Sequence, residues 1–155
     1  MTEQTTRAYE IVGRYWKWAA AAGLIPVPLI DIAAVAGLQL KMISELAEHY
    51  QVPFSRDRAK SIVAALTAAA TPPILAGTLF GLLGPAFKLV PGVGTVIGVI
   101  TTPLLNAAST LALGRIFVQH FESGGTLLDM NPDELREHYR KALEKAEQES
   151  ATESR

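Results

Sequence analysis

The 155-residue sequence contains no cysteine, which excludes disulfide bonds and thiolate metal sites. The three histidines, His49, His120 and His138, are far apart, and none has the spacing of a histidine metal motif. The net charge of −1 leaves no basic footprint for nucleic acid, which usually requires a clustered positive surface. We therefore predict no metal, no cofactor and no nucleic-acid partner.

Catalytic side-chain arrangements are also missing. The apolar half of the chain holds no cluster of titratable groups, and no Ser-His-Asp set or carboxylate pair has the spacing that catalysis requires. Active sites gather such groups because their chemistry depends on shifted pKa values. We therefore predict that this chain is not an enzyme.

Charge is nearly absent from the middle of the chain. Between Lys60 and Arg115 the only charged residue is Lys88, which separates two uncharged runs, residues 61–87 and 89–114. Each run exceeds the ~20 residues that an α-helix needs to cross a bilayer. An interior proline costs a helix ~3 kcal/mol, so breaks are expected at the prolines. The prolines taken as the breaks are those at positions 72, 73, 91 and 103. The two runs therefore predict a bent apolar hairpin of four short helices.

Amphipathic helices are predicted on both sides of this hairpin. Apolar residues recur at steps of three and four over residues 4–22 and 29–50. In the second of these helices, Gln39, Lys41 and Glu45 are assigned to the solvent face, and Lys41 can pair with Glu45 four positions later. After the hairpin, Asn131-Pro132-Asp133-Glu134 has the pattern of a helix start.

The predicted fold is all-α, with amphipathic helices around a central apolar, proline-broken helical hairpin. Residues 1–130 form the hydrophobic helical domain, and its central hairpin spans residues 61–114. Residues 131–155 form a C-terminal amphipathic helix that ends in a frayed polar tail. No alternation typical of strands is found in the sequence.

Two glycine pairs lie in the uncharged runs, and each has the spacing GxxxG. Gly77 and Gly81 lie in the first run, and Gly94 and Gly98 lie in the second. A nucleotide-binding loop would need a preceding strand and an acidic residue ~20 positions later, and both are missing. Glycines four apart share a helix face and let a second helix approach closely. We interpret these four as helix-packing positions, either within one hairpin or between chains.

Flanking charge favours membrane insertion of the hairpin. Arg56, Arg58 and Lys60 precede the first run and Arg115 follows the second, so both termini are predicted to be cytoplasmic. The first ten residues include two acids and no apolar core, so no cleavable signal is expected. The prolines leave open whether the hairpin crosses the bilayer or bends within it. A cytoplasmic soluble fold that buries the hairpin is the alternative.

Four residues are candidates for contact with lipid or its interface: Trp16, Trp18, Lys88 and Arg115. Tryptophans suit the membrane–water interface, although they also suit ordinary core positions. The lysine at the hairpin tip is either solvated or directed toward lipid headgroups. The arginine is a flanking anchor, or it pairs with Asp31 or Glu122 of another helix.

Three stretches together resemble a bacterial family, domain of unknown function six-nine-seven, which includes YcjF-like inner-membrane proteins. They are WAAAAGLIPVPLIDIAAVAGLQLKMISELAEHYQVPFS at 18–55, VPGVGTVIG at 90–98 and TLALGRIFVQHFESGGTLLD at 110–129. The resemblance implies a helical, hydrophobic, membrane-associated module of the bacterial inner membrane. Such modules sometimes follow a GTPase domain, which this chain lacks, so the resemblance implies a GTPase only as a partner in trans. It supplies no catalytic residues.

The sequence thus predicts a non-enzymatic, membrane-associated helical protein. We expect it to self-assemble into a homo-oligomer that acts as a membrane scaffold or shaping module. A regulatory partner of a separate GTPase and a soluble helical assembly are the alternatives. The partners expected are the chain itself and membrane lipid.

Overall fold

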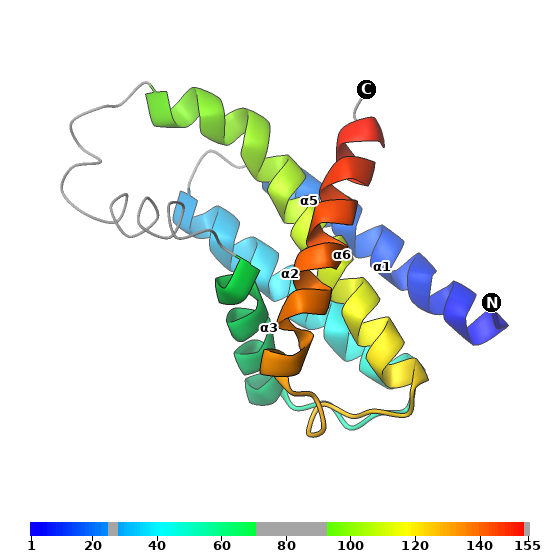
Figure 1. Cartoon of the computed structure of the whole chain (residues 1–155). Coiled ribbons are helices and arrows are strands. Elements are labelled where there is room, and N and C mark those ends of the chain that lie inside the picture. Colours follow the sequence, from blue (N-terminus) through cyan, green and yellow to red (C-terminus); the bar gives the residue numbers. More distant parts are fainter. Residues whose placement is uncertain (25–27, 71–92, 154–155) are drawn as a thin grey trace.

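The computed structural model of the chain describes residues 1–24, 28–70 and 93–153. Within these residues the chain forms five helices and no strand (Figure 1). They are α1 (Glu3–Ala22), α2 (Pro28–His49), α3 (Arg56–Ala70), α5 (Val93–Glu122) and α6 (Pro132–Glu153). The predicted all-α fold is confirmed.

Local side-chain contacts explain where the helices begin and end. The Thr2 hydroxyl accepts a hydrogen bond from the Thr5 amide at 3.2 Å and caps the start of α1, while the backbone of Gly23 closes its end. At the start of α6, the Asn131 carbonyl oxygen accepts from the Asp133 amide at 3.1 Å. The free amide groups of a first helical turn are satisfied in this way.

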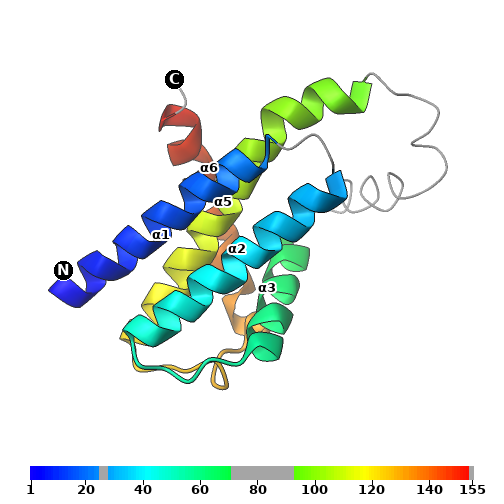
Figure 2. The same ribbon diagram turned by 180° about the vertical axis from the view of Figure 1, so that it is seen from behind.

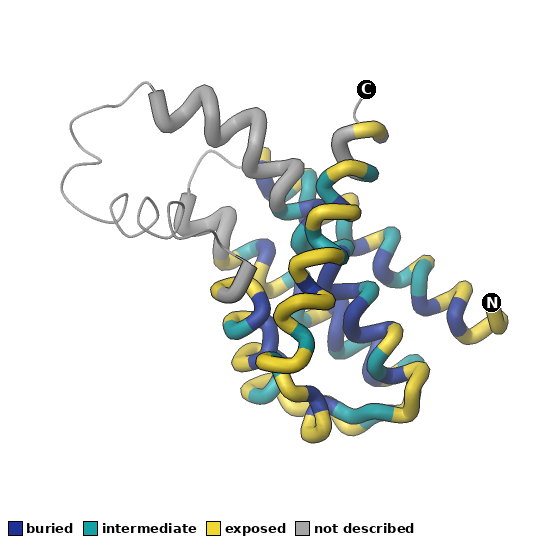
Figure 3. The backbone as a smooth tube through the Cα atoms, viewed as in Figure 1, coloured by how far each residue is buried: buried dark blue, intermediate teal, exposed yellow. Residues whose placement is uncertain are grey.

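The C-terminal half of α5 lies at the centre of the core. Its main neighbours are α1 and α6, while α2 completes the packing around it. Figure 3 shows buried positions recurring at intervals along these helices. The largest fully buried side chains are those of Tyr139, Phe117, Met42, Ile43, Leu46, Ile62, Leu66, Leu113, Leu127, Met130, Val12 and Val118.

The arrangement differs from the predicted central hairpin. Pro103 does not end a helix, because α5 runs without interruption from Val93 to Glu122. A proline removes one hydrogen bond of the helical ladder, and this 30-residue helix retains the turns on both sides of it. In the described residues α3 packs mainly on α6 and α2, whereas α5 packs on α1 and α6. The two arms are therefore held by other helices, and residues 71–92 between them lie outside the described residues.

The C-terminal helix is longer than the sequence predicts. α6 continues to Glu153, into the stretch expected to be a frayed tail. Tyr139 and Ala146 are buried along it, and Leu135 and Leu143 pack against the core. The apolar stripe therefore anchors the first four turns or so of this otherwise charged helix.

Candidate functional site at the uncharged end of the bundle

One end of the bundle is almost without charge. It is formed by residues 18–24 of the α1 side, 28–40 of α2, 61–70 of α3 and 93–114 of α5, whose only charged residue is Asp31. Figures 1 and 2 show the end of α1, the start of α2, the end of α3 and the start of α5 on the same side of the molecule. We call this the uncharged end. At the opposite, charged end, α1, α3 and α6 begin, and α2 and α5 end.

The alternating direction of the helices brings these segments together. α1 and α3 run toward the uncharged end, whereas α2 and α5 run away from it. The segments with little or no charge are C-terminal in α1 and α3. They are N-terminal in α2 and α5, and Asp31 of α2 is the single charged residue among them. α6 carries charge along its length, and its C-terminus points away from this end.

Two large apolar side chains at this end face solvent. Trp18 is 63% exposed and Leu24, just beyond the last turn of α1, is 69% exposed. Trp16 is half-buried, and the Lys17 ammonium lies 6.0 Å from the centre of its ring. Exposed apolar groups that gather beside an uncharged surface mark a site of contact with a protein or a membrane. Trp18 is therefore exposed at this end, and its contact with lipid stays a prediction.

A buried polar layer underlies the uncharged end and joins four helices. The Gln39 amide nitrogen donates to the hydroxyls of Ser109 and Thr110, each at 3.2 Å. The Ser109 hydroxyl lies 3.2 Å from that of Tyr139, which also hydrogen-bonds Thr67. Burial raises the pKa of Tyr139 and keeps its hydroxyl neutral. The sequence gives no sign of this layer, and the prediction that Gln39 faces solvent is wrong: it is 4% exposed.

Arg115 pairs with α6 rather than with either predicted partner. Its guanidinium contacts the Glu149 carboxylate at 2.5 Å. The predicted partner Glu122 instead accepts hydrogen bonds from Thr5 and, at 3.3 Å, from Tyr50. The side chain of Asp31, the other predicted partner, lies outside the described residues. Arg115 therefore pairs with another helix, which was one of its two predicted roles. The partner helix is α6, whose end was predicted to be frayed.

Specific polar contacts between helices are concentrated at the charged end. Glu45 accepts from Arg14 and, at 2.7 Å, from the Tyr15 hydroxyl, so it does not form the predicted pair with Lys41. Arg58 donates to the carbonyl oxygens of Leu127 and Met130, both at 3.1 Å. These bonds fasten the start of α3 to the loop that precedes α6.

Two tyrosines at the charged end have raised pKa values. Burial and the neighbouring Glu45 carboxylate raise the pKa of Tyr15 to about 12. Burial and Glu122 likewise raise the pKa of Tyr50 to about 12. In both cases the neutral phenol is favoured because it donates a hydrogen bond to the carboxylate. These groups hold helices together and leave no proton free for chemistry near neutral pH.

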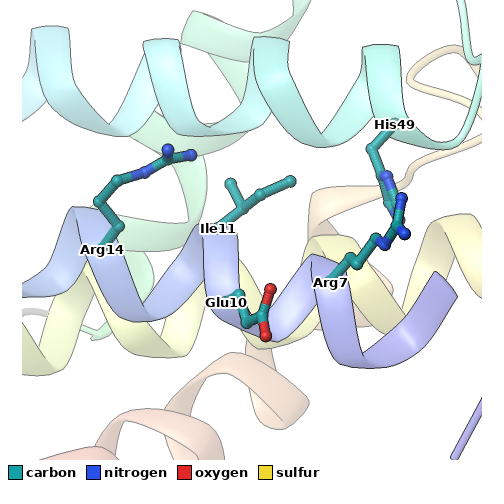
Figure 4. Close-up of a pocket in the computed structure, with 5 residues that line it drawn as sticks. All are labelled: Arg7, Glu10, Ile11, Arg14 and His49. Carbon is teal, nitrogen blue, oxygen red and sulfur yellow. The ribbon is translucent and has the colours of Figure 1, made fainter. Parts of the chain in front are cut away.

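A shallow hollow between α1 and α2 lies on the same half of the molecule. Figure 4 shows its lining residues, Arg7, Glu10, Ile11, Arg14 and His49. Its cations are already engaged, because Arg7 pairs with Glu3, Arg14 pairs with Glu45 and His49 contacts the Gln4 carbonyl oxygen at 2.8 Å. Among the residues that the structure describes, no group of His, Asp and Glu side chains has the arrangement of a metal site.

One glycine that permits close helix packing lies outside the two predicted pairs, whose role stays a prediction. A Cβ atom added to Gly114 would lie 2.5 Å and 2.7 Å from the two methyl groups of Val12, so α1 and α5 meet closely there. Gly94 and Gly98 lie near the start of α5. Gly77, Gly81 and Lys88 lie outside the described residues. Gly114 has no second glycine four residues away, so the sequence pattern gives no sign of its role.

Most of the chain matches a family model. Residues 1–148 match the family described as Domain of unknown function (DUF697). The chain belongs to this family. The resemblance inferred from the three stretches above is therefore confirmed, and the family's description assigns no activity.

A curated relative has a related sequence. Magnetosome membrane protein 22 of Magnetospirillum gryphiswaldense is 37% identical over 138 residues, which is 89% of this chain and 69% of the relative. No solved structure matches this chain. Among the helices that the structure describes, none has the length and hydropathy needed to cross a bilayer.

Proposed function

We propose that this protein is a non-enzymatic, membrane-associated module that contacts the bilayer through its uncharged end. The observation that carries the proposal is the convergence, at one end of the bundle, of four helix segments that together hold one charged residue, Asp31. Trp18 and Leu24 are exposed beside them. Burying such a surface in lipid costs little desolvation, because it holds a single charge in the four segments. The description of the relative as a membrane protein supports the same assignment.

The chain's two tryptophans make the contact measurable. A Trp16→Phe variant retains Trp18 as its only tryptophan. Mixed with vesicles whose acyl chains carry bromine, this variant should lose much of its fluorescence, because bromine quenches only tryptophans that enter the acyl region. Vesicles without bromine provide the reference intensity.

A tryptophan at the charged end provides the matched control. Phe54, between α2 and α3, is 39% exposed and lies at the opposite end from Trp18. In the variant Trp16→Phe/Trp18→Phe/Phe54→Trp, the single indole should keep its intensity with brominated vesicles. Equal quenching of both variants would show that the protein has no preferred end. No quenching of Trp18 in vesicle-bound protein would refute contact through the uncharged end.

We further propose that the membrane-bound protein assembles with copies of itself through the hairpin. Support comes from the GxxxG spacing of Gly94 and Gly98 near the start of α5, in the uncharged end. The variant Gly94→Leu/Gly98→Leu should reduce the mass of the assembly measured by mass photometry in mild detergent. A monomeric wild type under these conditions would contradict self-assembly. A variant that assembles as well as the wild type would place the glycines in contacts within one chain.

A further inference from the structure

Each of the four helices that build the uncharged end has a basic residue at the inner border of its segment. Going from this end toward the charged end, that residue is Lys17 in α1, Lys60 in α3 and Arg115 in α5. In α2 it is Lys41, apart from Asp31 near the helix start. The four positions come from distant parts of the sequence, so their relation depends on how the helices are aligned.

Contacts between α1 and α2 place the first two lysines at one level. Arg14 and Glu45 are in contact across these antiparallel helices. Lys17 lies three residues from that contact and Lys41 lies four residues from it, both toward the uncharged end. At 1.5 Å of rise per residue, their levels along the bundle agree to within about 2 Å.

The hydrogen bonds of the polar layer relate the levels of the other two basic residues, Lys60 and Arg115. Tyr139 bonds both Ser109 of α5 and Thr67 of α3, so these two residues lie at one level. Arg115 is six residues from Ser109 toward the charged end, and Lys60 is seven residues from Thr67 in the same direction. Their levels therefore also agree to within about 2 Å.

The same layer relates the two pairs of cations to each other. Gln39 donates a hydrogen bond to Ser109, so these two residues lie at a similar level. Toward the charged end, Lys41 is two residues from Gln39, whereas Arg115 is six residues from Ser109. The two pairs are thus separated by about 6 Å along the bundle axis, close to one helical turn. Four basic residues from four helices form a band at the border of the uncharged end.

Three of these cations are available to a ligand. Lys17, Lys41 and Lys60 are exposed, and none of the three forms an ion pair with another described residue. Arg115 is occupied by Glu149. We call Lys17, Lys41 and Lys60 the cationic collar. Trp18 follows directly after Lys17, so an exposed indole lies at the same height.

We propose that the cationic collar binds the phosphate groups of anionic phospholipids. This inference rests on the proposed contact between the uncharged end and the bilayer. Lysines and tryptophans are the residues typical of the headgroup level, where the charge reaches phosphate while the apolar stem lies against lipid. The uncharged end enters the acyl region, and the collar limits its depth and selects anionic membranes.

Vesicle binding with two lipid compositions tests the collar. Full-length protein is sedimented with phosphatidylcholine vesicles and with vesicles that contain phosphatidylglycerol. The collar variant is Lys17→Gln/Lys41→Gln/Lys60→Gln. Each lysine near an anionic surface contributes about 1 kcal/mol, so the variant should partition roughly 100-fold more weakly into anionic vesicles. Its binding to phosphatidylcholine should change little.

The control removes the same charge from outside the collar. In Arg7→Gln/Arg56→Gln/Arg136→Gln, all three arginines are exposed and lie near the starts of α1, α3 and α6. Arg56 is one turn from Lys60 on the side away from the uncharged end, so it tests position within α3. This variant should retain nearly all of the preference for anionic vesicles, and circular dichroism checks that both variants remain helical. An equal loss in both variants would show attraction through net charge and overturn the collar. A collar variant that binds anionic vesicles like the wild type would also overturn it, with the membrane contact still standing. A wild type that binds neither kind of vesicle would reject the membrane contact itself.

Discussion

The two ends of this bundle are built by different means. At the charged end, Glu45, Glu122 and Arg58 each bond groups on other helices or loops, so the geometry is set by hydrogen bonds as well as packing. At the uncharged end, the described helix segments carry one charge, and Trp18 and Leu24 stand exposed. The buried layer around Gln39 lies within the helix segments of the uncharged end.

This difference separates stability from function. A buried polar group must find a partner, so the contacts at the charged end and in the polar layer specify one alignment of the helices. Exposed apolar groups add nothing to a folded chain in water, and they are common where a protein meets another surface. Substitutions at the two ends should therefore affect different measurements.

The largest effect on folding is expected from Phe117→Ala. Phe117 is fully buried in the C-terminal half of α5, and truncating such a ring costs about 3–5 kcal/mol. Leu24→Ala is the matched change at the uncharged end, and it should alter the free energy of unfolding by less than about 0.5 kcal/mol. Denaturant unfolding of both variants measures this contrast. A similar loss of unfolding free energy in Phe117→Ala and Leu24→Ala would contradict the idea that the uncharged end contributes little to stability.

A smaller loss is expected from Gly114→Ala, where the helices approach closely. The new methyl group would press on Val12, and such overpacking costs about 1–3 kcal/mol. The cost should shrink when Val12→Ala is present, because the clashing methyl groups are then absent. Gly13→Ala in α1 is the control: its added Cβ meets no described atom within 4 Å, so it should be neutral or stabilising. The free energies of unfolding of the wild type, Gly114→Ala, Val12→Ala and the double variant give the coupling energy between the two positions.

The contacts at the charged end should make the fold sensitive to alkali. The pKa of the Tyr15 hydroxyl is about 10 in an unfolded chain and about 12 in the folded protein. A pKa raised by folding stabilises the protein below pH 10, and this contribution is lost as the pH rises toward 12. Thermal unfolding measured across this range should show a falling midpoint. The fall should be shallower in Tyr15→Phe, and an unchanged slope would mean that Tyr15 is not the group involved.

The smallest effect is expected where α6 pairs with α5. Glu149 is 42% exposed and Arg115 is 22% exposed, so solvent screens their attraction. Glu149→Gln should lower the free energy of unfolding by less than about 1 kcal/mol, and added salt should reduce the difference. A loss of several kcal/mol would show that α6 depends on this pair more than on Tyr139 and Ala146.

Helices are local structures, and their pattern could be predicted. Residues 4–22 and 29–50 were predicted as helices from apolar periodicity, and α1 and α2 occupy almost the same residues. The start of α6 followed from Asn131 and Pro132, because a cap acts within one turn of its own residue. Pro103 was misjudged: a proline removes one hydrogen bond of the helical ladder, and α5 nevertheless continues through it from Val93 to Glu122.

The candidate site was predictable only in part. The two uncharged runs on either side of Lys88 indicated an apolar surface, and Trp18 was identified as a residue that could meet lipid. The burial of Gln39 was missed because its partner Ser109 lies 70 residues away, beyond the reach of any periodic pattern. The close approach at Gly114 was missed for the same reason.

The sequence by itself determined the helices, their polarity and the long interval without charge, since these depend on residues that are neighbours in the chain. Only the tertiary structure decided which helix ends lie together and which residues share a level. Lys17, Lys41 and Lys60 are separated by 24 and 19 positions, and no property of the sequence between them aligns them. Packing around Phe117 and the hydrogen bonds of the polar layer set the relative positions of the helices, and the cationic collar follows from that alignment.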